Sequence, residues 1–123
     1  MANNRKVKLG FIPANRGFFS SELAAQMRNQ TVEVMESMGI DVVVPSDQDT
    51  TVGCVATLAE ADLTAKMFRR EGVQGIVVGA VNFGEEQPVA MCVRKAGLNV
   101  PVLIFGCQEE EVLKPDTDRR DSF

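Results

Sequence analysis

The sequence predicts an α/β fold in which a four-stranded parallel sheet carries helices on both faces. Short apolar runs alternate along the chain with longer segments of helical apolar spacing, in the order β-α-β-α-β-α-β. The runs VVVP, GIVVGA and PVLIFG are apolar at consecutive positions, which is typical of parallel strands buried on both faces. Right-handed crossovers between such strands favour a doubly wound sheet, and the expected strand order is 2-1-3-4.

The first strand is predicted over residues 6–13, KVKLGFIP, and the first helix over residues 20–38. Ser20 or Ser21 can cap this helix, and Gly39 can end it. The apolar residues that define its predicted buried face are Leu23, Met27, Val34 and Met38. Their spacing is close to that of one helical face, so we expect them to pack on the sheet.

The second strand is predicted over residues 40–45, IDVVVP, and is followed by the polar loop SDQDTTVG. A second helix is predicted over residues 55–71, with Gly72 as its stop. The apolar residues on its expected buried face are Val55, Leu58, Ala65 and Phe68. The third strand, VQGIVVGA, spans residues 73–80.

A third helix is predicted over residues 86–96, and a fourth strand over residues 100–106. The residues at i, i+3, i+4 and i+7 of this helix are Val89, Cys92, Val93 and Ala96. The α/β domain, of flavodoxin- or Rossmann-like kind, is therefore residues 1–106, and residues 107–123 are a charged tail leading toward a following domain. The fourth strand would be an apolar sheet edge, so we expect a fifth strand beyond residue 123, or another chain, to cover it.

Composition excludes several classes of partner and compartment. The 123 residues are 45% hydrophobic and 24% charged, with a net charge of −4 and no long basic run. Neither nucleic acid nor an anionic membrane is therefore an expected partner. No apolar segment approaches the roughly 20 residues of a membrane helix, and MANNRKVKLGF lacks a signal-peptide core. The expected compartment is the cytoplasm.

The cysteine and histidine content limits the possible chemistry. The chain contains no histidine, which excludes a Ser-His-Asp or Cys-His pair built from this chain alone. Its cysteines are Cys54, Cys92 and Cys107, with no C-x-x-C spacing, so neither a disulfide framework nor a cysteine zinc site is expected. Cys92 falls in an apolar helical pattern and is predicted to be core.

The candidate site lies in the turns that follow the first and third strands. In an open α/β sheet, ligands bind outside the carboxyl ends of the strands, where the strand order reverses. The predicted substrate-binding residues in these turns are Asn15, Arg16, Phe18, Asn82, Phe83 and Glu85. Guanidinium, amide and carboxylate groups would hydrogen-bond the hydroxyls of a polyhydroxylated ligand, and the rings would cover its C–H faces. No phosphate-binding glycine motif occurs, and no residue is assigned a catalytic role.

Each of these residue types also has a structural interpretation, which stays open at this point. Arg16 could be a solvated turn residue or the partner of a nearby glutamate. Phe18 and Phe19 could pack under the first helix as a hydrophobic staple. Glu85 and Glu86 could be first-turn acids that complement a helix dipole.

Four segments resemble the amino-terminal domain of the L-fucose/L-arabinose isomerase family. They are KLGFIPANRGFF, GIVVGAVNFGEEQPVA, VPVLIFG and the tail KPDTDRRDSF. The resemblance implies an aldose–ketose isomerase, which moves a proton between C1 and C2 of an open-chain sugar through an enediol. It also implies a divalent cation, Mn²⁺, as a Lewis acid in the full-length parent.

The family's metal ligands come from later domains and include histidine, which this chain lacks. We therefore expect no cofactor in this chain, and no isomerase activity from it alone. The resemblance further implies a homo-oligomer, a trimer or hexamer, in which the first domain contributes to a neighbouring subunit's active site. The matching positions here are Asn15, Arg16, Asn82 and Phe83.

The same strands and turns also resemble one lobe of a periplasmic sugar-binding protein or of a sugar-responsive repressor. In such proteins the turn after the first strand carries aromatic rings that stack on a sugar. The two interpretations share a fold, so fold alone does not separate them. The tail favours the isomerase, and the missing export signal counts against a periplasmic protein. A structural or partner-binding domain is the third alternative.

Overall fold

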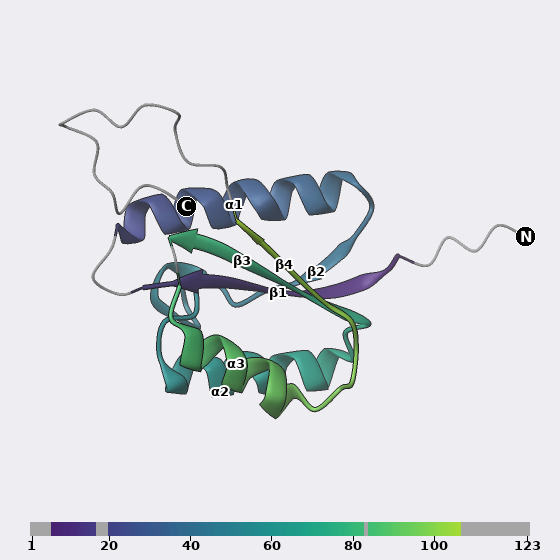
Figure 1. Ribbon diagram of the computed structural model, residues 1–123. Coiled ribbons are helices and arrows are strands. Elements are labelled where there is room, and N and C mark those ends of the chain that lie inside the picture. Colours follow the sequence, from purple (N-terminus) through teal and green to yellow (C-terminus); the bar gives the residue numbers. More distant parts are fainter. Residues whose placement is uncertain (1–5, 17–19, 83, 107–123) are drawn as a thin grey trace, which may run out of the picture.

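The computed structural model describes residues 6–16, 20–82 and 84–106 (Figure 1). Its strands form one parallel sheet in the order β2-β1-β3-β4, which confirms the predicted doubly wound fold. The strands are β1 (Lys8–Asn15), β2 (Asp41–Val43), β3 (Gly75–Asn82) and β4 (Val102–Gly106). The helices are α1 (Ser21–Ser37), α2 (Leu58–Glu71), α3 (Glu86–Ala96) and a 3-10 turn, η1 (Thr51–Gly53).

Helices cover both faces of the sheet. Figure 1 shows α1 alone on one face and α2 with α3 on the other. Between the sheet and the α2–α3 layer lies the larger apolar cluster, which includes Ile12, Val78, Phe68 and Cys92. A smaller cluster lies on the α1 side, around Ala24, Cys54 and Val81. The predicted core position of Cys92 is confirmed.

The ring of Phe68 packs directly on the backbone of β1. Phe68 is fully buried, and a Cβ built on Gly10 would lie 2.8 Å from the Phe68 Cζ atom. A glycine at residue 10 therefore lets α2 approach the middle of the sheet more closely than any side chain would allow. On the opposite face, Gly79 has the same relation to the rings of Phe11 and Phe105, which stack with their centroids 6.4 Å apart.

The helix ends follow their capping residues. The Ser20 hydroxyl accepts a hydrogen bond from the Leu23 amide at 3.1 Å, as expected of a cap for α1. Gly39 and Gly72 follow α1 and α2 in the left-handed region, with φ of 82° and 64°. The predicted start of the second helix, at residue 55, is three residues early.

The shift has a clear physical cause. Thr57 and Glu60 form a capping box, so α2 begins at Leu58. Val55 instead lies extended beside β1 and forms a parallel bridge with Ala14. It occupies the flank of β1 that the short strand β2, which pairs only with Lys8 to Gly10, leaves open.

The predicted buried face of α1 is wrong in its second half. Ala24 and Met35 are the buried residues of α1, whereas the Val34 and Met38 side chains are 58% and 70% exposed. Val34 precedes Met35 by one position, which is about 100° around a helix, so both cannot face the sheet. The small side chain of Ala24 lets α1 pack close to the sheet. With Ala24 and Met35 buried, Val34 and Met38 are left on the exposed side of the helix. Leu58 of α2 is likewise half exposed, against expectation, because it is the first residue of its helix.

Strand β4 is the sheet edge, as expected, but its faces are open. Val102, Leu103 and Ile104 are 42%, 63% and 70% exposed. The prediction that helices cover both faces of every strand is therefore wrong for β4 in the described residues. The predicted tail, residues 107–123, lies outside them. Within the described part of the chain, every helix is too short or too polar to span a lipid bilayer.

Replacing Phe68 with Ala should lower the free energy of unfolding by about 3–5 kcal/mol, because it removes a fully buried ring from the centre of the core. Denaturant unfolding followed by circular dichroism measures the change. Leu58→Ala is the control, since the half-exposed Leu58 should cost less than about 1 kcal/mol. Equal losses in the two variants would contradict the packing of α2 on Gly10.

We expect the buried thiols of Cys54 and Cys92 to make the protein less stable at alkaline pH. Burial raises the pKa of Cys54 and of Cys92 to about 12, from 9.0. Above pH 9 the unfolded chain releases these protons while the native chain keeps them, so rising pH favours unfolding. Between pH 8 and pH 10 the free energy of unfolding should fall by on the order of 1 kcal/mol per thiol. Denaturant titrations should show a smaller fall in Cys92→Ala, and an equal fall in that variant would contradict the assignment.

Candidate functional site

The candidate site is built on the pairing of β1 with β3. These strands are parallel neighbours, and their register runs from Leu9 opposite Gly75 to Asn15 opposite Asn82. The register shifts between Ala14 and Asn15, at the end of the ladder. Because both strands end at the same rim of the sheet, the turns that follow them leave side by side.

The Arg16 side chain joins the two turns. Its Nε donates a hydrogen bond to the Gly84 carbonyl oxygen at 2.9 Å and lies 3.7 Å from Oε1 of Glu85. The side chains of Arg16 and Glu85 are 30% and 35% exposed, so water reaches the pair. An ion pair of this exposure contributes at most about 1 kcal/mol to stability. The Arg16–Glu85 pair places a positive and a negative group together at the rim. This is where the turns after the first and third strands were predicted to meet, because the strand order reverses there.

Gly84 makes this contact possible, and sequence reasoning missed it. Its φ is +78°, and a Cβ built on it would lie 2.5 Å from the Ala14 Cβ. The turn after β3 therefore lies directly against the end of β1, where only glycine fits. The sequence signal for this close contact was the glycine in NFGEE, but glycine is common in turns that make no such contact.

Asn15 lies at the base of the site. The residue is almost fully buried, and its backbone amide donates to the Val55 carbonyl at 2.9 Å. The Val55 amide in turn donates to the Pro13 carbonyl at 2.8 Å. The structure thus brings Asn15, Arg16 and Glu85 to one rim, while their role in ligand binding stays a prediction.

The other predicted site residues are only partly placed. Asn82 is the last residue of β3 and its backbone lies opposite Asn15, but its side chain is not described. Phe18 and Phe83 lie outside the described residues, and so does Phe19.

Glu85 and Glu86 take different places at the start of α3. Glu85 is at the N-cap without a side-chain capping hydrogen bond. Glu86 is in the first turn, which matches its structural interpretation as a first-turn acid.

A second unpredicted contact holds the loop after β2 at the same rim. Arg28 of α1 donates from Nη2 to the Pro45 carbonyl at 2.6 Å and from Nε to the Gly53 carbonyl at 3.2 Å. Within this loop Val52 has a φ of 51°, a left-handed conformation that is strained for a β-branched residue. Arg28 therefore fixes a strained loop beside the site, and nothing in the helical pattern of the sequence indicates this role.

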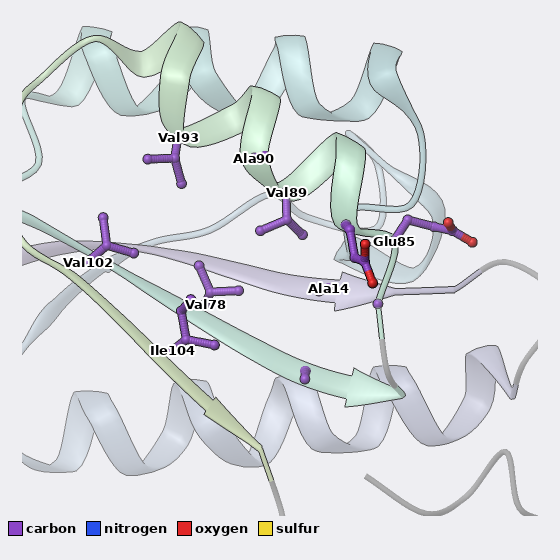
Figure 2. A pocket seen from close by; sticks show the side chains of 11 residues that line it. Ala14, Val78, Glu85, Val89, Ala90, Val93, Val102 and Ile104 are labelled. Carbon is purple, nitrogen blue, oxygen red and sulfur yellow. The ribbon is translucent and has the colours of Figure 1, made fainter.

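Next to the rim lies an apolar groove of about 580 Å³ between α3 and the β3–β4 edge, called here the α3–β4 groove. Its apolar side chains, most of them seen in Figure 2, are Ala14, Val78, Ala80, Val89, Ala90, Val93, Val102 and Ile104. Glu85 lies at one end of the groove in Figure 2, and Glu86, the next residue in the chain, also lines it. With apolar walls and polar groups at only one end, the groove does not itself offer the hydrogen bonds that a polyhydroxylated ligand needs.

The described residues do not assemble a metal centre. Across residues 6–16, 20–82 and 84–106, no group of three or more His, Cys, Asp or Glu side chains could hold a metal ion. The Mn²⁺ that the family resemblance implies was expected in later domains of the parent enzyme, and it stays a prediction.

A comparison with known families identifies the class of protein. The sequence model of the family described as "Fucose/sulfoquinovose isomerase, N-terminal domain" matches residues 10–123. The chain belongs to this family of isomerase N-terminal domains, in agreement with the resemblance seen in its motifs. Searches of curated proteins and of solved structures found no match.

Replacing Gly84 with Ala should displace the turn after β3 and break the Arg16–Gly84 hydrogen bond, because the new methyl group would overlap Ala14. We expect a loss of about 2–4 kcal/mol, which combines the left-handed strain with the steric overlap. Chemical denaturation gives the loss, and amide shifts of Arg16 report the displaced turn.

Gly39→Ala is the matched control for this change. Gly39 has a φ of +82°, close to that of Gly84, but nothing lies within 4 Å of its Cβ position. It should therefore lose only the strain, about 1–2 kcal/mol. The same loss in both variants would mean that the turn does not press on Ala14.

Proposed function

We propose that this chain is the substrate-positioning N-terminal domain of a sugar aldose–ketose isomerase. The observation that carries the proposal is the contact of Arg16 with Gly84 and Glu85, which unites two chemistry-bearing turns at the switch point of the sheet. Membership in a family of fucose/sulfoquinovose isomerase N-terminal domains supports the sugar as the class of ligand.

The site residues suit the recognition of hydroxyl groups. A guanidinium is a planar set of N–H donors, and a carboxylate is a pure acceptor at neutral pH. Arg16 and Glu85 together can therefore donate to and accept from neighbouring hydroxyls of one sugar. The predicted partners Phe18, Asn82 and Phe83 would extend this set, with aromatic rings for the apolar face of the ring or chain.

The proton transfer itself is proposed to take place on residues outside this domain. An isomerase of this type needs a base to remove the C2 or C1 proton and an electrophile for the enediolate oxygen. The described residues contain no metal cluster, so the proposal assigns Mn²⁺ and its ligands to another part of a longer, homo-oligomeric enzyme. In this arrangement Arg16 and Glu85 orient the substrate for a neighbouring catalytic centre.

The alternative of a metal-independent sugar-binding lobe makes a different prediction. A binding lobe binds its sugar without Mn²⁺ and releases it unchanged. The isomerase interconverts an aldose and a ketose, and its turnover depends on the metal. The family match favours the isomerase.

In the longer protein with Mn²⁺, Arg16→Ala should lower kcat/KM for the preferred sugar ten- to hundred-fold, as the loss of a charged hydrogen-bond donor predicts. The assay is aldose–ketose interconversion over a sugar panel that includes fucose and sulfoquinovose. The melting temperature should fall only slightly, because the exposed pair stabilises the fold weakly.

Arg70→Ala is the control, since that arginine side chain is 72% exposed on α2 and pairs with Glu71, away from the rim. Arg16→Lys separates charge from shape, because lysine keeps the charge but loses the planar donor set. An unchanged kcat/KM in Arg16→Ala, or a large loss of melting temperature, would overturn the assigned role.

A further inference from the structure

The loop between β2 and α2, residues 44–57, is held by a charged side chain from each of two helices. Arg28 of α1 binds its carbonyls at Pro45 and Gly53, as described above. Glu60 of α2 binds its amides. The guanidinium and the carboxylate, called here the loop clamp, thus hold the same loop through opposite hydrogen-bonding groups.

The Glu60 carboxylate accepts hydrogen bonds from three backbone amides of this loop. Its Oε2 accepts from Thr51 at 2.7 Å, and its Oε1 accepts from Ala56 at 2.9 Å and from Thr57 at 3.2 Å. The bond to Thr57 belongs to the capping box of α2. The bonds to Thr51 and Ala56 go beyond the cap and reach back into the loop. Hydrogen bonds to an ionised group are roughly twice as strong as neutral ones, so Glu60 is suited to hold a loop.

Two unfavourable features show why this loop needs a clamp. Val52 has a left-handed φ of 51°, which is strained for a β-branched residue. The hydroxyl oxygen of Thr50 is buried and has no hydrogen-bond partner in the described part of the chain. A strained conformation persists only where surrounding contacts over-determine it, and the loop clamp supplies such contacts.

The clamped loop brings Val55 to the carboxyl end of β1. The clamp binds the backbone at Gly53 and at Ala56, on both sides of Val55. The Val55 amide donates to the Pro13 carbonyl at 2.8 Å, and the Val55 carbonyl accepts from the Asn15 amide at 2.9 Å. Val55 therefore closes the flank of β1 at the point where the candidate site begins.

Asn15 and Arg16 depend on support from this flank. On the other side, Asn15 pairs with Asn82 of β3, but the register shifts immediately before this pair. A shift of this kind disrupts the ladder locally, so the support from β3 is weakest here. Arg16 follows directly and extends to the Gly84 carbonyl. The hydrogen bond from Asn15 to Val55 thus helps to fix the direction in which Arg16 leaves β1.

We propose that Arg28 and Glu60 are positioning residues for the candidate site. They fix the loop, the loop fixes Val55, and Val55 holds the backbone of Asn15 and Arg16 in place. Such a preorganised rim does not have to be ordered when a ligand binds, which favours affinity. The proposal rests on the proposed function only for the sugar as ligand, since the positioning itself is measurable in the 123-residue chain without a ligand.

The first test is Arg28→Ala in the 123-residue chain. Relative to the amides of the β1–β3 ladder, the Asn15 amide should exchange its hydrogen more than about ten-fold faster, because Val55 loses its fixed position. The NMR signal of the Arg16 Nε–H group should shift as well. Met35→Ala is the control, since it removes a buried side chain two turns along the same helix. This variant should lose stability without changing the relative exchange rate of Asn15.

Glu60→Gln tests the clamp from the other helix. Glutamine keeps one oxygen for the cap at Thr57, but its NH₂ group does not accept the Thr51 amide. The helix content of α2 should therefore stay unchanged, while the amides of Thr51 and Asn15 exchange more than about three-fold faster. Arg28→Lys keeps the charge but loses the planar fork that spans two carbonyls, so it should fall between wild type and Arg28→Ala.

Two results would overturn the proposal. One is unchanged Asn15 exchange in Arg28→Ala, and the other is an equal acceleration in Met35→Ala, which would make Arg28 an ordinary stabilising residue. In the isomerase assay proposed for Arg16→Ala, Arg28→Ala should lower kcat/KM about ten-fold, and Met35→Ala less than about two-fold. Faster Asn15 exchange together with unchanged kcat/KM in Arg16→Ala and Arg28→Ala would refute the sugar-handling role and leave the positioning of Arg16 established.

Discussion

The parallel pairing of β1 with β3 is the constraint on which the rest of this molecule depends. Its register aligns the ends of the two strands, so that Asn15 lies opposite Asn82. The turn after β3 then folds back onto Ala14 through Gly84, and the Gly84 carbonyl accepts the hydrogen bond from Arg16. A slip of one residue would turn every side chain of β1 to the opposite face and would separate the two turns.

The pairing of β1 with β3 also explains why burial is greatest over these two central strands and least at β4. Glycines at 10 and 79 let Phe68 on one face and Phe105 on the other lie directly on the backbone of the two central strands. Burial is therefore concentrated over β1 and β3, where Phe11, Ile12 and Phe68 are fully enclosed. Toward β4 the helices end, and the apolar residues Leu103 and Ile104 remain exposed.

The arginines illustrate why parts of the site escape a sequence pattern. Arg28 and Arg16 both bind backbone carbonyls of segments far away in the sequence, at Pro45, Gly53 and Gly84. Every residue has a backbone carbonyl, so the sequence does not indicate which of them an arginine side chain will bind. The position of Arg16 after the first strand indicated the rim at which it lies but not its carbonyl partner. Arg28 lies within a helix, where a charged residue normally indicates a solvated face.

The sequence by itself determined the element types, the strand order and the rim at which the first and third strands end together, because apolar periodicity and crossover handedness are local or nearly universal rules. It also determined the helix ends at Ser20, Gly39 and Gly72, since capping depends on a few adjacent residues. Only the tertiary structure decided that Val55 pairs with β1, that Met35 rather than Val34 faces the sheet, and that Arg16 binds the turn after β3. These outcomes depend on which distant surfaces meet and how closely they approach, and short-range patterns do not carry that information.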